Sequence, residues 1–356
     1  MTLSKKKNVC IVSCSRADYG LLKKLIKLFQ KDKNFNLNFT ITGSHLSKSH
    51  GYTIDEIIND KIKIDHQINF KKFDGNLTAI SDSISLIITS FTKILKRVKP
   101  NLVIILGDRF EILGVSLAAL IARVPIAHIH GGELTEDSID DSIRHAVTKL
   151  SNIHFVATNT YKKRIIQLGE NPKEIFEVGG LGIDAIHSTN FIQKNKIEKK
   201  LDFKLWKKNI IVTFHPITTK KNISIIHFNH LLKAASQNKD ILFIFTSPNI
   251  DHENQKLVKI LKIHCNSHSN SIFFKSLGQL NYFSLLKHVD GVLGNSSSGL
   301  LEVPSFKKAT INIGDRQKGR LLSPSVINTK ANSLEINKSI KKMYSKSFIK
   351  KLKKSN

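Results

Sequence analysis

Apolar runs of strand length alternate with amphipathic helical stretches from one end of this 356-residue chain to the other. The strands expected in the first half span residues 9–13, 38–42, 102–106, 126–129, 154–157 and 175–178. Those expected in the second half span residues 210–214, 242–246, 272–274, 291–293 and 310–313. Because strands that alternate with helices form parallel sheets covered by helices, we assign the chain to the α/β class.

The alternation pauses once, in a polar and lysine-rich interval at residues 191–208, and then restarts. A chain of this length is expected to form two domains rather than one. We therefore predict two Rossmann-like lobes, at residues 1–190 and 191–335. Residues 336–356 predict a strongly basic helix that packs back on the N-terminal lobe, and a tail that binds nucleic acid is the alternative.

The formal net charge is +28, from 56 Lys and Arg against 28 Asp and Glu. Such a charge ordinarily points to nucleic acid or anionic lipid, because clustered cations release counterions from a polyanion. Here the excess is almost wholly lysine scattered among Asn and Ile, and only eight residues are arginine. Since the sequence also contains no helix-turn-helix, zinc-finger or aromatic RNA-binding pattern, we expect no nucleic-acid partner. The few arginines are expected where a guanidinium must bind phosphate or carboxylate.

The sequence predicts neither a membrane span nor a signal peptide, because it has no run of 18 apolar residues and no small-residue cleavage site near its start. The three cysteines, Cys10, Cys14 and Cys265, are too few for a disulfide framework. Cys10 and Cys14 also lack the spacing of a CxxC redox or zinc motif. These features favour a reducing, cytoplasmic location.

The loops that follow the expected strands are the most informative, because ligands of open α/β sheets bind beyond the carboxyl ends of the strands. The first such loop holds Arg16 and Asp18 and runs into a helix. The chain has neither a GxGxxG fingerprint nor a GxxxxGK[ST] loop, which disfavours NAD dehydrogenases and P-loop kinases. An arginine at a strand-to-helix turn suits an anionic ligand. A structural pair between Arg16 and Asp18 is the alternative.

Carboxylates follow two further strands of the first lobe. Asp108 and Arg109 come directly after residues 102–106 and fit a general base beside a phosphate-binding cation, or a helix N-cap. The next loop and helix hold a dense group of titratable residues, His128, His130, Glu133, Asp140, Asp141, Arg144 and His145.

This dense group permits two interpretations. Two histidines at i and i+2 with a glutamate suit a cupin-like metal site, but the α/β alternation contradicts that fold, so we predict no metal. Paired carboxylates that transfer protons explain the group better. A helix N-cap is the alternative for Asp140 or Asp141.

Polar residues also follow the strands of the second lobe. They are His215, Asn249, Ser296, Ser297, Glu302 and Arg316. The loop of Ser296 and Ser297 opens a helix and suits a phosphate, and Glu302 is placed one turn on to accept from ribose hydroxyls. A structural role is the alternative for His215. Anion-binding loops in one lobe and carboxylates in the other predict an enzyme that acts on a nucleotide-linked substrate.

Seven segments of these loops also occur, in the same order, in a known family. They are Ser15-Arg16-Ala17-Asp18-Tyr19, Gly107-Asp108-Arg109, His130-Gly131-Gly132-Glu133, Asp140-Asp141-Ser142-Ile143-Arg144-His145, Phe214-His215-Pro216, Gly294-Asn295-Ser296-Ser297 and Gly314-Asp315-Arg316-Gln317. Through them the chain resembles the UDP-N-acetylglucosamine 2-epimerase family, in particular its hydrolysing branch, which feeds nonulosonate (sialic or legionaminic acid) synthesis. The resemblance implies the GT-B architecture, with the active site in the cleft between two Rossmann-like lobes.

The resemblance implies a hydrolytic epimerisation in which the C2 proton of the sugar is removed while UDP leaves C1. The resulting glycal adds water with inversion at C2 and gives an N-acetylmannosamine-type sugar. The implied catalytic candidates are Asp108, Glu133, Asp140, His130 and His215. The implied UDP-sugar-binding residues are Arg16, Asp18, Arg109, Asp141, Arg144, His215, Asn249, Ser296, Ser297, Glu302 and Arg316. No metal or redox cofactor is implied, and a homodimer or homotetramer is expected.

One position departs from the family pattern, because animal-type members carry Glu directly before the Gly-Gly pair, where this chain has His130. Either His130 or Glu133 is therefore a candidate for that acid–base role. The sugar also has two alternatives, UDP-N-acetylglucosamine and UDP-N,N'-diacetylbacillosamine, the latter giving 2,4-diacetamido-2,4,6-trideoxymannose. A GT-B glycosyltransferase is the alternative of another class, although the carboxylates of the first lobe favour the epimerase.

Overall fold

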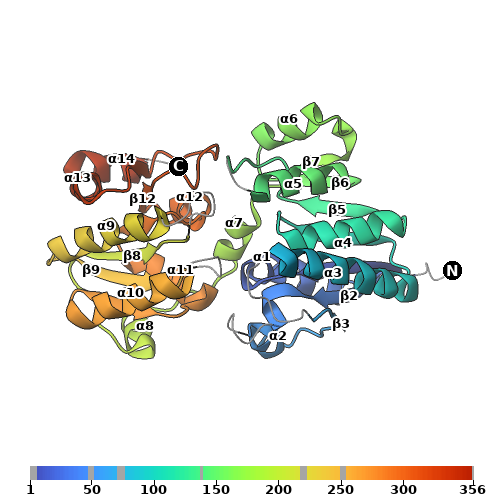
Figure 1. Ribbon diagram of the computed structural model, residues 1–356, viewed down its shortest axis with the longest axis horizontal. Helices are drawn as coiled ribbons and strands as arrows, with labels where there is room; N and C mark the ends of the chain where they lie inside the picture. Colours follow the sequence, from blue (N-terminus) through green and yellow to red (C-terminus); the bar gives the residue numbers. More distant parts are fainter. Residues whose placement is uncertain are drawn as a thin grey trace. The chain divides into compact units, whose positions relative to one another are not determined.

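The computed structural model describes residues 6–46, 52–69, 77–136, 139–216, 223–248 and 254–354, and it divides into two compact units. Unit 1 comprises Met1–Leu134 and Ile139–Ala185, and unit 2 comprises Thr135–Ser138 and Ile186–Asn356. Figure 1 colours unit 1 from blue to green and most of unit 2 from yellow to red. Apart from Thr135–Ser138, the chain enters unit 2 at Ile186, whereas the sequence analysis placed the limit at residue 190.

Unit 1 contains a seven-stranded sheet in the order β3-β2-β1-β4-β5-β6-β7, with every neighbouring pair parallel. Its strands are β1 (Lys7–Ser13), β2 (Phe35–Ile41), β3 (His66–Gln67), β4 (Leu102–Leu106), β5 (Ile126–Ile129), β6 (Ile153–Val156) and β7 (Ile175–Glu177). Its helices are α1 (Arg16–Lys31), α2 (Ile54–Asn59), α3 (Leu77–Val98), α4 (Phe110–Ile121), α5 (Ile139–Lys149) and α6 (Asn159–Gln167), with α7 (Leu181–His187) at the passage to unit 2.

Both faces of this sheet are buried. On β4, Val103 and Ile105 belong to the core formed with α3 and α4, whereas Ile104 and Leu106 belong to the core formed with α1 and α2. Successive side chains of a strand point to opposite faces, so helices cover the sheet on both sides. A strand buried on both faces reads as a continuous apolar run, which is why these strands could be predicted from the sequence.

Helix α3 is long and apolar enough, by length and composition alone, to cross a membrane. In the structure, Ile87, Phe91 and Leu95 of α3 are buried in the core of unit 1. Gly114 of α4 brings that helix close, because a Cβ at this position would lie 3.1 Å from the Ile87 side chain. These three residues thus form part of a packed core face of α3.

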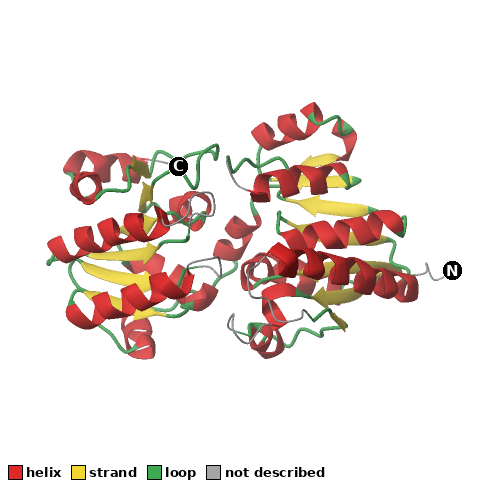
Figure 2. Cartoon of the chain, in the orientation of Figure 1, coloured by secondary structure: helices red, strands yellow, loops and turns green. Residues whose placement is uncertain are grey.

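Unit 2 contains a six-stranded parallel sheet in the order β10-β9-β8-β11-β12-β13. Its strands are β8 (Asn209–Thr213), β9 (Leu242–Thr246), β10 (Ser271–Phe274), β11 (Gly291–Gly294), β12 (Ala309–Ile313) and β13 (Val326–Thr329). Its helices are α8 (Lys194–Leu201), α9 (Ile223–Gln237), α10 (Asn254–Ser267), α11 (Gly278–His288), α12 (Ser298–Leu301), α13 (Ser333–Met343) and α14 (Lys346–Lys354). Figure 2 shows the strands of each sheet flanked by helices.

The prediction of two α/β lobes with parallel sheets is confirmed. The sequence analysis missed β3 and β13, the outer strands at one edge of each sheet. It also interpreted residues 191–208 as a boundary, although α8 forms inside that interval. Short or partly exposed elements lack the apolar run or strong periodicity on which the prediction relied.

The basic C-terminal tail is part of the core of unit 2. Ile336 and Ile340 of α13 and Phe348 and Leu352 of α14 belong to its hydrophobic cluster, while the lysines of both helices are exposed. The apolar face of the tail is thus used by unit 2. That the tail also packs on the N-terminal lobe stays a prediction.

We predict that Phe348→Ala lowers the free energy of unfolding of unit 2 by about 3–5 kcal/mol, because it removes a buried aromatic ring and leaves a cavity. The adjacent Ile349→Ala is the matched control; its side chain is 39% exposed, and its cost should stay below about 1 kcal/mol. Trp206, the single tryptophan, lies in unit 2 and reports urea unfolding by its fluorescence. Equal losses in the two variants would contradict the packing of the tail.

Candidate active site

The charged residues predicted in the first lobe gather at the carboxyl end of the unit 1 sheet. Gly107 and Asp108 follow β4, and His130 follows β5. Because β4 and β5 are parallel neighbours, both loops leave the sheet at the same edge. Helix α5, the next element in the chain, carries Asp141 and Arg144.

Arg144 connects these segments. Its side chain is almost fully buried; Nη2 donates to Asp108 Oδ2, and Nη1 donates to Asp141 Oδ1 at 3.1 Å and to the Glu133 carbonyl oxygen at 2.9 Å. Burial disfavours the charge of Arg144, but the charges of Asp108, Glu133 and Asp141 outweigh it and raise its pKa. A charged guanidinium therefore fixes two carboxylates and one backbone carbonyl of the site.

His130 and Glu133 form a second contact beside this network. His130 Nδ1 lies 2.8 Å from Glu133 Oε1, and both side chains are largely buried. His130 has a φ of 66°, a left-handed conformation that is uncommon for a residue with a Cβ. The turn is held in part by the His130 N–H, which donates to the Phe155 carbonyl oxygen of β6 at 3.0 Å. The histidine that departs from the family pattern thus contacts the glutamate that was the other acid–base candidate.

Asp140 and Asp141 are both in the first turn of α5, where carboxylates interact favourably with the helix dipole. Asp140 is exposed. Asp141 contacts Arg144 through Oδ1, and its Oδ2 lies 3.5 Å from His145 Nε2. Since α5 begins at Ile139, neither aspartate precedes the helix, and the N-cap interpretation of either was wrong.

Arg109 is paired with Glu111, a residue to which the sequence analysis gave no role in the site. Its Nε and Nη2 donate to the two Glu111 carboxylate oxygens at 3.1 and 2.9 Å. The charge of Glu111 raises the pKa of Arg109 against the effect of burial, and Asp18 adds to the increase. Glu111 is the one carboxylate among the buried residues of the largely apolar helix α4, and this is the signal that could have identified it.

The loop after β1 caps helix α1. Ser15 Oγ accepts from the Asp18 N–H at 3.3 Å, and Asp18 Oδ2 accepts from the Cys14 N–H at 3.3 Å. These bonds satisfy N–H groups at the helix start, in the manner of a capping box. Burial raises the pKa of Asp18 to about 6, although the charge of Arg109 acts in the opposite direction. Arg16, the first residue of α1, is exposed.

In unit 2, Asn295 lies in the loop after β11 and binds the loop after β8. Its Oδ1 accepts from the His215 N–H at 2.6 Å, and its Nδ2 donates to the His215 carbonyl oxygen at 2.9 Å. Arg316 Nη1 and Gln317 Nε2 donate to the Asn295 carbonyl oxygen at 3.1 and 2.9 Å. Asn295 is fully buried and was missed as a site residue, although it occurs in a segment that carried the family resemblance. The loop after β12 is thus tied to the loop after β11.

Burial lowers the pKa of His215 well below its ordinary value, and the charge of Arg316 lowers it further. His215 is therefore a neutral imidazole near neutral pH. The positive charge at this point of unit 2 belongs to Arg316.

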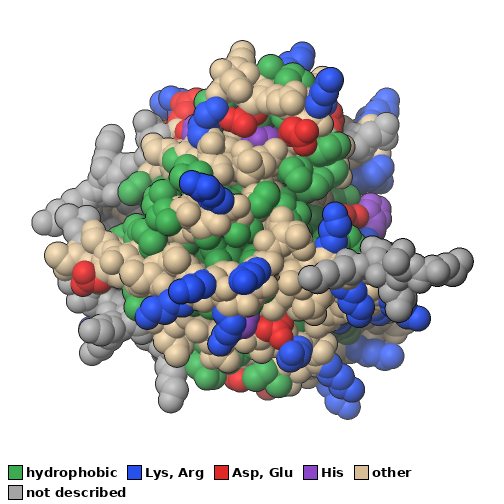
Figure 3. Space-filling view, turned by 90° about the vertical axis from the view of Figure 1, so that its right-hand side faces the viewer, with side chains coloured by type: hydrophobic (Ala, Val, Ile, Leu, Met, Phe, Trp, Pro, Cys, Tyr) green, Lys and Arg blue, Asp and Glu red, His purple; other side chains and the backbone are tan. Residues whose placement is uncertain are grey.

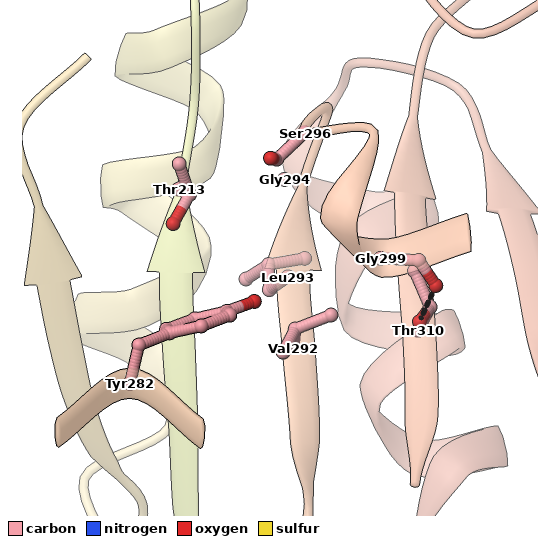
Figure 4. Close-up of a pocket in the computed structure, with 8 residues that line it drawn as sticks. All are labelled: Thr213, Tyr282, Val292, Leu293, Gly294, Ser296, Gly299 and Thr310. Atoms are coloured by element: carbon pink, nitrogen blue, oxygen red, sulfur yellow. Dashed lines mark hydrogen bonds between the residues drawn. The ribbon is translucent and has the colours of Figure 1, made fainter. Parts of the chain in front are cut away.

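A small pocket lies beside the carboxyl end of β11 (Figure 4). It is lined by Thr213, Tyr282, Val292, Leu293, Gly294, Ser296, Gly299 and Thr310. Gly294 has a φ of 142°, and a Cβ there would lie 1.9 Å from the Thr213 carbonyl oxygen, so the close approach of β8 requires glycine. Thr310 Oγ1 donates to the Gly299 carbonyl oxygen at 2.6 Å and holds the turn of α12 to β12.

Tyr282 connects this pocket to Glu302 through Ser298. The Tyr282 hydroxyl lies 2.8 Å from Ser298 Oγ, which donates in turn to Glu302 Oε2. Burial raises the pKa of Glu302, although the bond from Ser298 lowers it. Ser297 is the residue before α12, and Ser296 Oγ accepts from the Ser298 N–H at 3.4 Å. The predicted phosphate and ribose residues therefore share one short turn.

Asn249 lies outside the described residues. Within the described part of the chain, no three His, Cys, Asp or Glu side chains are arranged as metal ligands.

The family model for UDP-N-acetylglucosamine 2-epimerase matches residues 27–356. The chain is 40% identical to the GDP/UDP-N,N'-diacetylbacillosamine 2-epimerase (hydrolyzing) of Campylobacter jejuni, over 96% of this chain and 89% of that protein. It is 37% identical to the polysialic acid biosynthesis protein P7 of Escherichia coli, over 90% and 82% of the two chains. It is 31% identical to the UDP-N,N'-diacetylbacillosamine 2-epimerase (hydrolyzing) of Legionella pneumophila, over 90% and 84%.

Solved structures of the same fold include the UDP-GlcNAc 2-epimerase of Neisseria meningitidis bound to UDP-GlcNAc. It aligns with a TM-score of 0.72 at 20% identity and covers 98% of this chain and 94% of that one. The UDP-GlcNAc 2-epimerase of Methanocaldococcus jannaschii in complex with UDP-GlcNAc and UDP aligns with a TM-score of 0.78 at 16% identity, over 96% and 94% of the two chains. The match over nearly the whole sequence establishes that the chain belongs to the UDP-N-acetylglucosamine 2-epimerase family.

Proposed function

We propose that the chain is a hydrolysing UDP-sugar 2-epimerase, which releases UDP and inverts C2 of a 2-acetamido sugar. Family membership and the names of the Campylobacter and Legionella relatives support this reaction type. The observation that carries the assignment of the catalytic centre is the buried Arg144, whose guanidinium holds Asp108 and Asp141. Carboxylates at fixed positions are what proton transfer at a sugar carbon requires.

The reaction balances as an elimination followed by the addition of water. A base takes the C2 proton, the C2–H electron pair forms the C1=C2 bond of a glycal, and the C1–O pair leaves with UDP. Water then gives its hydroxyl group to C1, while a proton is delivered to C2 on the opposite face. We propose Asp108 and Glu133 as acid–base groups, with His130 sharing a proton with Glu133 across their 2.8 Å contact. Asp140 is a further candidate.

We propose that unit 2 binds the uridine diphosphate. Arg316 supplies positive charge for the diphosphate, and the neutral His215 is suited to hydrogen bonding rather than charge neutralisation. Ser296 and Ser297 are proposed to bind phosphate oxygens, and Glu302 to accept from the ribose hydroxyls. The further residues proposed for UDP-sugar binding are Arg16, Asp18, Arg109, Asp141, Arg144 and Asn249.

The substrate is UDP-N-acetylglucosamine or UDP-N,N'-diacetylbacillosamine, and the names of two relatives support the latter. These two relatives are 40% and 31% identical to this chain. The UDP-N-acetylglucosamine 2-epimerase of Neisseria meningitidis serogroup B is 29% identical. From UDP-N,N'-diacetylbacillosamine the product is 2,4-diacetamido-2,4,6-trideoxymannose, a precursor suited to legionaminic acid synthesis.

The wild-type protein is expected to release UDP from at least one of the two nucleotide sugars without an acceptor. We predict that Asp108→Asn lowers kcat by about 100-fold to 10,000-fold, because it removes a proton-transfer group. UDP affinity measured by calorimetry should change little. Asp240→Asn, an exposed carboxylate of unit 2, is the control and should retain wild-type kcat.

Full turnover by Asp108→Asn would remove Asp108 from the mechanism. If the wild-type protein released no UDP from either sugar until an acceptor was added, a GT-B glycosyltransferase would replace the epimerase.

The raised pKa of Asp18 makes the stability of the folded protein depend on pH. Its pKa is about 6 in the folded protein and 3.8 in its ordinary state, so protonation is easier in the folded state. Its stabilising contribution is therefore present at low pH and lost as pH rises through about 6. We predict that Asp18→Asn, which mimics the neutral form, gains on the order of 1–2 kcal/mol of stability relative to wild type between about pH 4.5 and 7.5.

Thermal unfolding of the two proteins across this range measures the effect, with exposed Asp32→Asn at the other end of α1 as the control. If the stabilities of wild type and Asp18→Asn depended on pH in the same way, the raised pKa of the Asp18 carboxyl group would be contradicted.

We propose a homodimer or homotetramer in the cytoplasm. Leu120 and Ile121 at the end of α4 expose half or more of their side chains. Figure 3 shows one face of the protein on which hydrophobic side chains gather, with Lys and Arg around them. Such surfaces mark protein contacts. Sedimentation at the 40.1 kDa mass of one chain would contradict the assembly.

Cell fractionation tests the proposed cytoplasmic location, and epimerase activity outside the cytosolic fraction would contradict it.

A further inference from the structure

His128 on β5 joins two parts of the carboxylate centre that are distant in the sequence. Its side chain is fully buried. Nε2 lies 2.8 Å from the Gly107 carbonyl oxygen, and Nδ1 lies 3.2 Å from Thr148 Oγ1 on α5. Gly107 directly precedes Asp108, and Thr148 is one helical turn beyond Arg144. One imidazole therefore lies between the loop that carries Asp108 and the helix that carries its ion-pair partner.

The hydrogen-bond partners fix the tautomer of this imidazole. Burial lowers the pKa of His128 to about 3, so the ring is neutral and carries one N–H near neutral pH. A carbonyl oxygen can only accept, so the proton is on Nε2 and is donated to Gly107. Nδ1 then accepts from the Thr148 hydroxyl, whose single proton is shared with the Arg144 carbonyl oxygen 2.9 Å away.

The backbone around His128 favours its contacts with Gly107 and Thr148. The Gly107 N–H donates to the Ile129 carbonyl oxygen at 3.0 Å, so β5 binds Gly107 through both its N–H and its carbonyl group. Gly107 has a φ of 79°, which glycine adopts readily. A Cβ on Gly131 would lie 3.0 Å from Thr148 Oγ1 and 3.1 Å from His128 Nδ1. Glycine at 131 therefore leaves the space in which histidine and threonine meet.

We propose that His128 is a positioning residue that holds Asp108 in register with Arg144. This rests on the proposed function, in which Asp108 is an acid–base group. His128 acts through the Gly107 peptide on one side and through α5 on the other. Without the imidazole, the peptide before Asp108 loses its bond to the side chain, and the carboxylate can shift relative to the sugar C2. A displacement of about 1 Å in a catalytic group can cost about 100-fold in rate.

The test compares His128→Phe with His128→Gln. Phenylalanine fills the site but cannot donate to Gly107, whereas the glutamine amide places an N–H near the position of the imidazole Nε2. We expect His128→Phe to lower kcat by about 10-fold to 100-fold, with KM and UDP affinity changed little, and His128→Gln to recover much of the loss. His154→Phe is the matched control, because His154 is a fully buried histidine paired in register with His128 on the adjacent strand β6.

The proposal is overturned if His128→Phe keeps wild-type kcat, if His154→Phe loses as much kcat as His128→Phe, or if glutamine restores nothing. Should His128→Phe fail to fold, the same comparison is made with Thr148→Val, which removes the other hydrogen-bond partner and is expected to lower kcat in the same way. A crystal structure of His128→Phe provides a readout that needs no turnover. The Asp108 carboxylate is expected to move away from Arg144, and an unchanged position would reject the proposal even if the wild-type protein proved not to be an epimerase.

Discussion

The buried guanidinium of Arg144 is the interaction on which the carboxylate centre of unit 1 depends. A buried charge is costly unless it is paired and hydrogen-bonded, and Arg144 is paired with Asp108 and Asp141 and donates to the carbonyl group of Glu133. The same bonds bring groups from β4, β5 and α5 together at one edge of the sheet. Stability and proximity of the proposed acid–base groups thus have a common cause, because loosening of these loops would weaken the pairing of a buried arginine.

In unit 2, a neutral residue rather than a charged one joins the loops of the candidate site. Asn295 is fully buried and binds His215 through its amide and Arg316 through its backbone carbonyl group. An amide can donate and accept at once, so it joins two loops without adding charge. The positive charge is left to Arg316, and burial beside that charge keeps His215 neutral. This arrangement supports the proposed binding of a diphosphate, which needs both a cation and hydrogen-bond donors.

The sequence predicts the strands and charged loops of this protein better than the contacts between those loops. Strands buried on both faces, such as β4 and β9, have apolar runs whose predicted limits match the structure, whereas the two-residue β3 has no such run. The charged loops were located because they follow those strands. Their pairing was not, because Arg144 and Asp108 are 36 residues apart in the sequence and Asn295 and His215 are 80 apart. His128 was predicted only as one member of a titratable group; its proposed positioning role depends on Gly107 and Thr148, which meet it only in the folded chain.

The most direct test of the central claim is proton NMR in D2O, with UDP-N-acetylglucosamine and UDP-N,N'-diacetylbacillosamine supplied separately to the wild-type protein. Hydrolysis through a glycal predicts free UDP together with a manno-configured sugar that carries deuterium at C2, because the new C2 hydrogen comes from solvent. The sugar that is consumed faster identifies the preferred substrate. Release of UDP with retention of the original C2 hydrogen and configuration would contradict the account, because the carboxylates around Arg144 would then take no part in proton transfer at C2.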